Sequence, residues 1–111
     1  MEILASDLKN ILKKYDRRFD IRGYGNVYLR EHGGCCALRY KGQHVGSIPP
    51  KIYEYTRSDW CAYDRTVNDK GEVVYTDSRP HRNLAQVLRM VSQYLPGKDV
   101  GRVIQDIKAR Q

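Results

Sequence analysis

The chain has 111 residues and a mass of 12.9 kDa, which predicts one compact domain over residues 1–111. Hydrophobic residues make up 41% and charged residues 30%, which excludes wholesale disorder; no apolar run reaches the ~20 residues of a membrane span, and the N-terminus lacks the pattern of a secretory signal. We therefore expect a soluble cytoplasmic protein without membrane partners, located in the host cytoplasm if a phage encodes it. The formal net charge is +7, with +4 in residues 1–41, −1 in residues 42–81 and +4 in residues 82–111. Such a balance favours a phosphate-rich partner, although it is also ordinary for a soluble small domain.

The first predicted element is an amphipathic helix over residues 4–15, with apolar residues at three- and four-residue steps. Its basic side and end supply candidate contacts to an anion: Lys13, Lys14, Arg17 and Arg18. Strand patterns follow at residues 19–22, 27–32, 35–40 and 44–48. Gly33-Gly34 and Lys41-Gly42 (or Gly42-Gln43) are expected to form tight turns between them.

The middle of the chain gives a weaker pattern. Residues 52–56 fit a strand or an extended crossing segment, and residues 60–67 and 72–76 fit a hairpin around the turn signature at 68–71. A helix with its first turn near Pro80 and a stripe from Leu84 to Leu95 follows, and a last helix comes after Pro96-Gly97. The predicted class is α+β: an N-terminal helix, an antiparallel β-meander of four to six strands, and two C-terminal helices packed on the sheet.

One face of this sheet is a candidate binding surface. A turn at Gly33-Gly34 places Tyr28 opposite Arg39, and a turn at Lys41-Gly42 places His44 on the other side of Arg39. Together with Arg30, these residues offer a stacking ring beside cations, which suits nucleic acid or a nucleotide-like anion. The alternative is an ordinary solvated face with a Tyr–Arg cross-strand pair.

A second candidate anion site is the predicted start of the helix after Pro80. Arg79, His81 and Arg82 gather there, where free backbone N–H groups and the helix dipole attract anions. The same residues also fit unpaired surface charge.

A Tyr-rich segment provides candidate protein contacts. Nine of the eleven aromatic residues are Tyr, and rigid amphipathic rings favour contact surfaces. The residues singled out are Tyr53, Tyr55, Arg57, Trp60 and Tyr63. Trp60 also fits a small local core between sheet and helix.

Catalytic, metal and cofactor patterns are weak. Cys35, Cys36 and Cys61 form no C-x-x-C pair, and the three histidines lack finger-like spacing, so we expect reduced thiols and no metal or cofactor. Lys41, His44 and His81 form an acid/base trio that small basic proteins offer by chance. We therefore expect no enzymatic activity.

The order helix, strands, helix with basic helices resembles that of double-stranded-RNA-binding domains. The lysine cluster at the start of their last helix is absent here, and the extra strands and final helix are foreign to that fold. The small size, basic ends and lack of motifs also resemble small proteins of phages and mobile elements, including inhibitors of bacterial defence.

Two functions follow as predictions. The first is a non-catalytic module that binds nucleic acid or a nucleotide-like anion. The alternative is a protein-interaction module of phage or mobile-element type, similar to anti-CRISPR inhibitors, which blocks a host nucleic-acid-handling or defence complex. A homodimer is a further possibility, because the last helix can pair with its copy.

Overall fold

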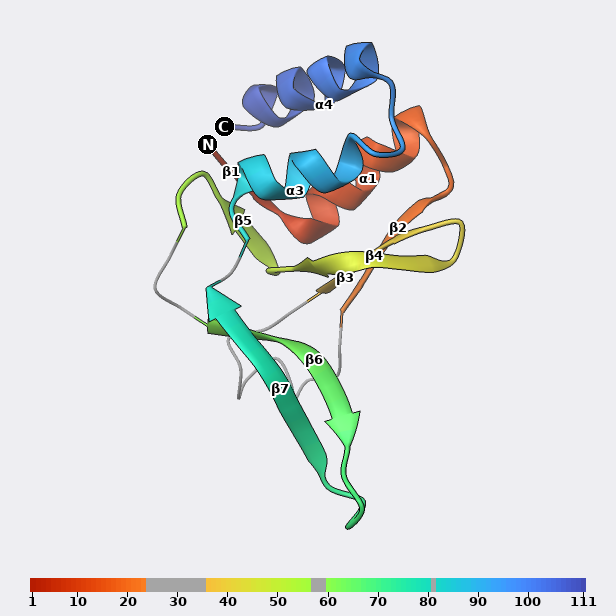
Figure 1. The fold of residues 1–111 in the computed structure, drawn as a ribbon. Coiled ribbons are helices and arrows are strands. Elements are labelled where there is room, and N and C mark those ends of the chain that lie inside the picture. The colour runs from red at the N-terminus through yellow and green to blue at the C-terminus, as the bar shows by residue number, and fades with distance from the viewer. Residues whose placement is uncertain (24–35, 57–59, 81) are drawn as a thin grey trace.

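The computed structural model describes residues 1–23, 36–56, 60–80 and 82–111, and only the backbone is given for 60–66 and 73–80. The chain follows an α+β order of helix, strands and two C-terminal helices, as predicted (Figure 1). The elements in that order are β1 (Glu2–Leu4), α1 (Ala5–Tyr15), β2 (Phe19–Gly23), β3 (Cys36–Tyr40), β4 (Gln43–Ile48), β5 (Lys51–Tyr53), β6 (Trp60–Val67), β7 (Val73–Pro80), α3 (Leu84–Val91) and α4 (Gly97–Ala109).

The described strands form three antiparallel sheets, with the orders β1–β5, β2–β3–β4 and β6–β7. The consecutive strands β2, β3 and β4 are the predicted meander. Lys41-Gly42 is the predicted tight turn, and both residues have positive φ angles of 53° and 76°. Two positive φ angles in a two-residue turn match the twist of the flanking strands.

The predicted partner of Arg39 across Gly33-Gly34 is wrong. β3 pairs with β2, so Arg39 lies opposite Asp20 on that side and opposite His44 on the other, as predicted for His44. The non-local ladder with β2 occupies the edge of β3 that the sequence-local hairpin rule assigned to Tyr28. Tyr28 itself and Arg30 lie outside the described residues.

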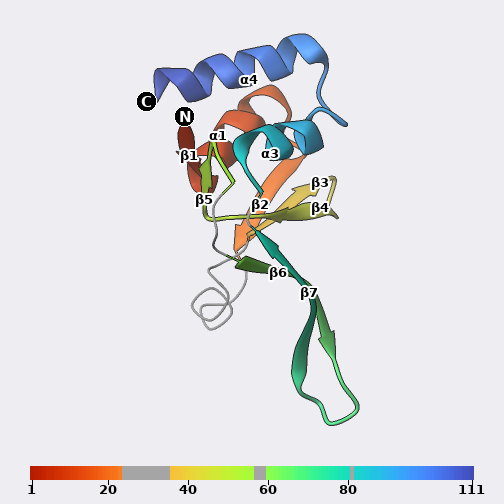
Figure 2. The ribbon, with the colours of Figure 1, turned by 60° about the vertical axis from the view of Figure 1, so that its left-hand side comes forward.

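The helices cover one face of the β2–β3–β4 sheet, and the β6–β7 hairpin points away from the other (Figures 1 and 2). Leu8 and Leu12 of α1, Val87 and Val91 of α3, and Val103 and Ile107 of α4 are fully buried with Leu38 of β3. The predicted apolar stripes therefore form the core. The radius of gyration is 14.4 Å, above the ~13 Å of a compact chain of this length, as the projecting hairpin requires.

Two boundaries differ from the prediction. Leu4, expected to begin the first helix, instead ends β1, which pairs with β5, and the Ala5 N–H donates to the Pro50 carbonyl at 2.8 Å. Pro80 ends β7, and α3 begins after Asn83, whose side chain accepts from the Gln86 N–H while the Gln86 side chain accepts from the Asn83 N–H. This reciprocal cap satisfies two donors at the helix start, which Pro80 could not do.

Candidate functional site

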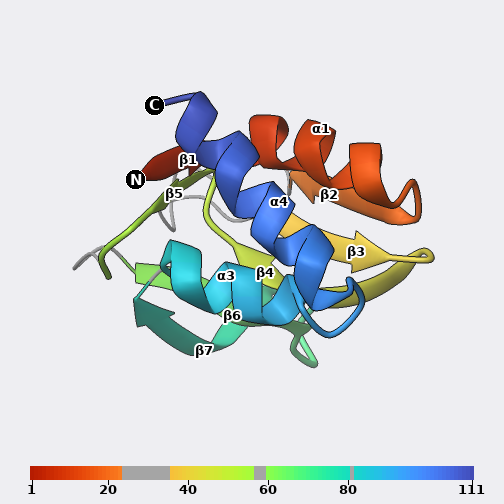
Figure 3. The same ribbon diagram turned by 90° about the horizontal axis from the view of Figure 1, so that it is seen from above.

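Three connections meet at one end of the molecule: α1–β2, β3–β4 and α3–α4 (Figures 1 and 3). The Lys41 N–H donates to the Arg18 carbonyl at 2.9 Å, which joins the first two connections, and the Tyr40 ring stacks on the Tyr94 ring, which joins the third. We call this group the turn cluster. Its members are Arg17, Arg18, Arg39, Tyr40, Lys41 and Tyr94.

The aromatic part of the cluster is a stacked pair. The ring centroids of Tyr40 and Tyr94 are 4.4 Å apart with an interplanar angle of 22°, and Phe19 meets the edge of Tyr40 at 4.7 Å. Tyr40 is 7% exposed, because strand alternation turns it toward the core side of β3, whereas Tyr94 is 40% exposed. The pair therefore has one buried ring and one that reaches solvent.

A half-buried carboxylate holds the Tyr40 side chain in place. The Tyr40 hydroxyl donates to Asp16 Oδ2 at 2.7 Å, and the Arg18 guanidinium donates to both oxygens of Asp16 at 2.9 Å. The hydrogen bonds from Arg18 keep the pKa of Asp16 well below its usual range, and the bond to Asp16 raises the pKa of Tyr40. Both groups are thus fixed in the ionic states that bind each other at neutral pH.

Cations surround this aromatic pair. The Arg18 guanidinium carbon lies 5.1 Å and the Lys41 ammonium nitrogen 5.9 Å from the Tyr40 ring centroid. Arg17 is exposed in the α1–β2 turn, and Arg39 donates to the Gly42 carbonyl. Arg17, Arg39 and Lys41 form no ion pair with any residue that the structure describes. Exposed His44 lies opposite Arg39.

Elsewhere many described basic side chains lie beside a carboxylate. Lys13 is 4.0 Å from Asp20, and Lys14 is 3.1 Å from Asp106, whose pKa is lowered by hydrogen bonds from Tyr15 and Lys14. The other such pairs are Lys9–Asp20, Arg22–Asp20, Lys51–Glu2, Arg102–Asp99 and Arg110–Asp7. Each lysine of α1 therefore already lies beside a carboxylate, although Lys9 and Lys13 share Asp20 with Arg22.

The structure brings together four of the ten residues predicted to bind an anion: Arg17, Arg18, Arg39 and His44. It does not bring Lys13 and Lys14 to them as free charges, because both lysines face carboxylates.

The predicted cluster of Arg79, His81 and Arg82 at a helix start stays a prediction, because only the backbone of Arg79 is described and Arg82 directly precedes the Asn83 cap of α3. Arg79 belongs to β7, opposite Cys61, and half-buried Arg82 donates to the Ser47 carbonyl at 2.6 Å, which ties the start of α3 to β4. His81 lies outside the described residues.

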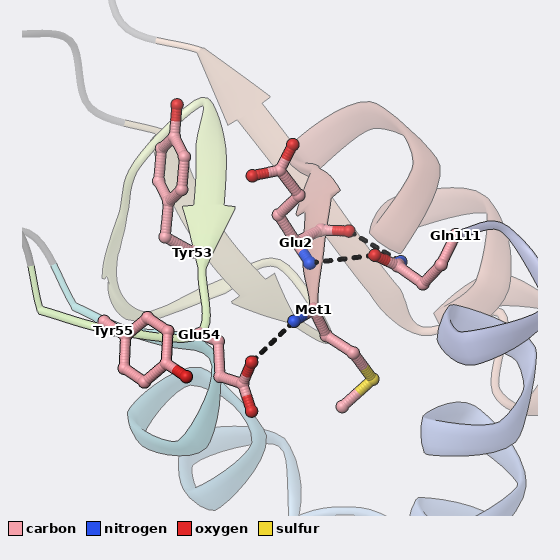
Figure 4. Close-up of a pocket in the computed structure, with 6 residues that line it drawn as sticks. All are labelled: Met1, Glu2, Tyr53, Glu54, Tyr55 and Gln111. Atoms are coloured by element: carbon pink, nitrogen blue, oxygen red, sulfur yellow. Dashed lines mark hydrogen bonds and ion pairs between the residues drawn. The ribbon is translucent and has the colours of Figure 1, made fainter.

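The predicted protein contacts separate along the chain. Arg57 lies outside the described residues, while Trp60 and Tyr63 belong to β6, whose backbone alone is described. Tyr53 and Tyr55 line a pocket of about 540 Å³ with Met1, Glu2, Glu54 and Gln111 (Figure 4). Tyr55 is 77% exposed, and Tyr53 is half-buried beneath the Lys51 ammonium group.

The carboxylates of this pocket are already compensated. Glu2 lies 3.1 Å from Lys51, and Glu54 lies 2.6 Å from the amine of Met1, as Figure 4 shows for Glu54. The Gln111 side chain exchanges hydrogen bonds with the Glu2 backbone. The pocket therefore offers aromatic surface, without a free cation for a phosphate among its lining residues.

Sequence reasoning missed Tyr40, Lys41 and Tyr94. The sequence does give one indication for Tyr94. This aromatic residue is not part of the apolar stripe from Leu84 to Leu95, and it stands directly before Leu95-Pro96-Gly97, where the helix must end. Nothing in the sequence, however, indicated that this ring meets Tyr40.

Within the described ranges, no group of three or more His, Cys, Asp or Glu side chains is arranged to hold a metal ion. None of the helices described is both long and apolar enough to span a bilayer. No family model, curated protein or solved structure matches this chain, so its function has to be inferred from the geometry of its own residues.

Proposed function

We propose that this chain is a non-catalytic binding module for nucleic acid or another phosphate-rich polyanion, and that the turn cluster is its binding site. The observation that carries the proposal is the gathering, at one end of the molecule, of three cations that form no ion pair with a described residue: Arg17, Arg39 and Lys41. A cation already beside a carboxylate gains little from a phosphate, whereas an uncompensated one releases counterions from the polyanion.

Two neighbouring helix ends extend this charge. Arg89 lies in the last turn of α3 and Lys98 in the first turn of α4, on either side of the segment that carries Tyr94. Both are exposed and form no ion pair with a described residue. Lys70 at the hairpin turn and Lys108 near the end of α4 also form no ion pair with the part of the chain that the structure describes. The β6–β7 turn and the C-terminal end of α4 lie far from the turn cluster (Figure 1).

The test is a salt titration of binding to mixed-sequence oligonucleotides, followed by fluorescence anisotropy. We expect affinity to fall linearly with salt on a logarithmic scale. The double variant Arg17→Gln/Lys41→Gln should reduce the slope by about 1.4–1.8, because each lost phosphate contact contributes ~0.7–0.9. The matched control Lys70→Gln/Lys108→Gln removes the same charge elsewhere and should leave the slope nearly unchanged.

Equal effects of the two double variants would show that only net charge matters and would refute the assignment of the site. Undetectable binding to every oligonucleotide at low salt would refute the function.

The alternative is a protein-interaction module that blocks a host nucleic-acid-handling or defence complex. It is favoured by the projecting β6–β7 hairpin, which shares no ladder with the other described strands, and by the exposure of Tyr55. A pull-down from nuclease-treated bacterial lysate tests it: a specific host protein should be retained by the wild type and lost when the hairpin is shortened. Retention that needs intact nucleic acid would favour the first function instead.

A further inference from the structure

We propose that the turn cluster binds single-stranded rather than duplex nucleic acid, with an unpaired base stacked on the Tyr94 ring. The inference rests on the proposed function and names the form of nucleic acid that this site takes. Tyr94 carries no charge, so the proposed function, which rests on the cations of the cluster, does not depend on it.

Tyr94 is the more exposed ring of the stacked pair. Tyr40 covers one face of this ring in the stacked pair, and Phe19 meets it at 6.2 Å in an edge contact with an interplanar angle of 82°. The residue is still 40% exposed, so part of it remains accessible to a ligand from solvent. An aromatic face of this kind accepts any base, because every base has a π-surface.

The ring beneath Tyr94 is already held in place by other contacts. Tyr40, on which Tyr94 rests, is held by its hydrogen bond to Asp16 at 2.7 Å and by Phe19 at 4.7 Å. A base that stacks on Tyr94 therefore extends an existing stack and orders few additional side chains. Pre-organisation of this kind lowers the entropic cost of binding.

Basic side chains lie close to the stacked pair of Tyr40 and Tyr94. Lys41 and Arg18 lie 5.9 and 5.1 Å from the centroid of the ring on which Tyr94 stacks, and Arg17 is next to Arg18 in the chain. A strand that extends past the stacked pair from a base on Tyr94 can place the phosphates of adjoining nucleotides beside Lys41 and Arg17, while Arg18 stays paired with Asp16. In a duplex the bases are stacked on each other and cannot reach the ring, so only the charge contacts remain.

The experiment compares one mixed-sequence 12-mer, as a single strand and annealed to its complement, in the same low-salt buffer. The wild type should bind the single strand more tightly than the duplex. Tyr94→Leu, which keeps an apolar side chain on Tyr40 but removes the ring, should weaken single-strand binding about tenfold and leave duplex binding unchanged. Tyr94→Phe should behave as the wild type, and Tyr55→Leu, which removes an exposed ring elsewhere, should have no effect on either.

A second readout uses the unmodified protein and does not depend on how the variant folds. Addition of the single strand should shift the ring proton resonances of Tyr94 upfield in NMR spectra, because a stacked base shields them, while the duplex should not.

The inference is overturned if the duplex binds as tightly as the single strand, if Tyr94→Leu weakens both equally, or if the ring resonances do not move. Salt-dependent binding that is still reduced by Arg17→Gln/Lys41→Gln would then leave the proposed function standing. If the wild type binds neither the single-stranded nor the duplex 12-mer, the proposed nucleic-acid-binding function is refuted as well.

Discussion

Replacement of Asp16 by Asn tests the bond network beneath the turn cluster. The two oxygens of Asp16 accept from the Arg18 backbone N–H at 3.0 Å, twice from its guanidinium at 2.9 Å, and from the Tyr40 hydroxyl at 2.7 Å. The Asn amide removes the charge and replaces one acceptor oxygen with a donor. Tyr40 then loses its charged partner in a site where its ring is nearly buried.

The expected cost is about 2 kcal/mol in the free energy of unfolding. The bond from Tyr40 to a charged acceptor contributes ~1.5–3 kcal/mol, whereas the Arg18 pair contributes ~1 kcal/mol or less, because the Arg18 side chain is 56% exposed. A change of this size lowers the melting temperature of a domain of this length by roughly 10 °C.

The sign of the pH dependence follows from the lowered pKa. Because the pKa of Asp16 in the folded state lies below its value of about 3.9 in the unfolded chain, its contribution is complete above that value and is lost as the pH falls toward the folded pKa. Urea unfolding curves of wild type and Asp16→Asn should therefore differ by a constant amount from pH 8 to about pH 5 and converge below about pH 4.

Glu72→Gln is the matched control. Glu72 is exposed near the hairpin turn, and its loss of charge should change stability by no more than ~0.5 kcal/mol. If the difference between wild type and Asp16→Asn stays the same down to pH 2, the ionised carboxylate is not its source and the reasoning fails.

The remaining predictions concern stability and binding at other places in the fold. Gly46→Ala should cost about 1 kcal/mol or less in urea unfolding, because the new methyl group meets only Met90 Cε, the end of a flexible side chain that can move aside, and still less in a Met90→Ala background. Asn83→Ala should cost ~1 kcal/mol by removing the cap of α3, whereas an effect below 0.3 kcal/mol would contradict the role of that cap. Arg39→Ala should change stability by ~0.5 kcal/mol or less, since the half-exposed Arg39 side chain donates, among the described residues, to the exposed Gly42 carbonyl, and should weaken oligonucleotide binding in anisotropy titrations. A large drop in melting temperature with unchanged binding would identify Arg39 as a structural residue.

Periodicity alone determined the helices and the class of the fold. The stripes of α1, α3 and α4 are local properties of the chain, because every third or fourth residue of a helix returns to the same face. The Lys41-Gly42 turn was also predictable, since two residues with positive φ suit a tight hairpin. From that turn followed the juxtaposition of Arg39 and His44.

Tertiary structure decided which strands pair and which charges stay free. A one-dimensional pattern shows that residues 36–40 form a strand, but the neighbour opposite Arg39 is Asp20, because β2 competes successfully for that edge. Likewise, Lys14 and Arg17 look alike in sequence, yet Asp106, 92 residues after Lys14, compensates only the first. The site at Tyr40 and Tyr94 exists because packing of α3 against β4 brings together two rings 54 residues apart, and no local property of either segment encodes that contact.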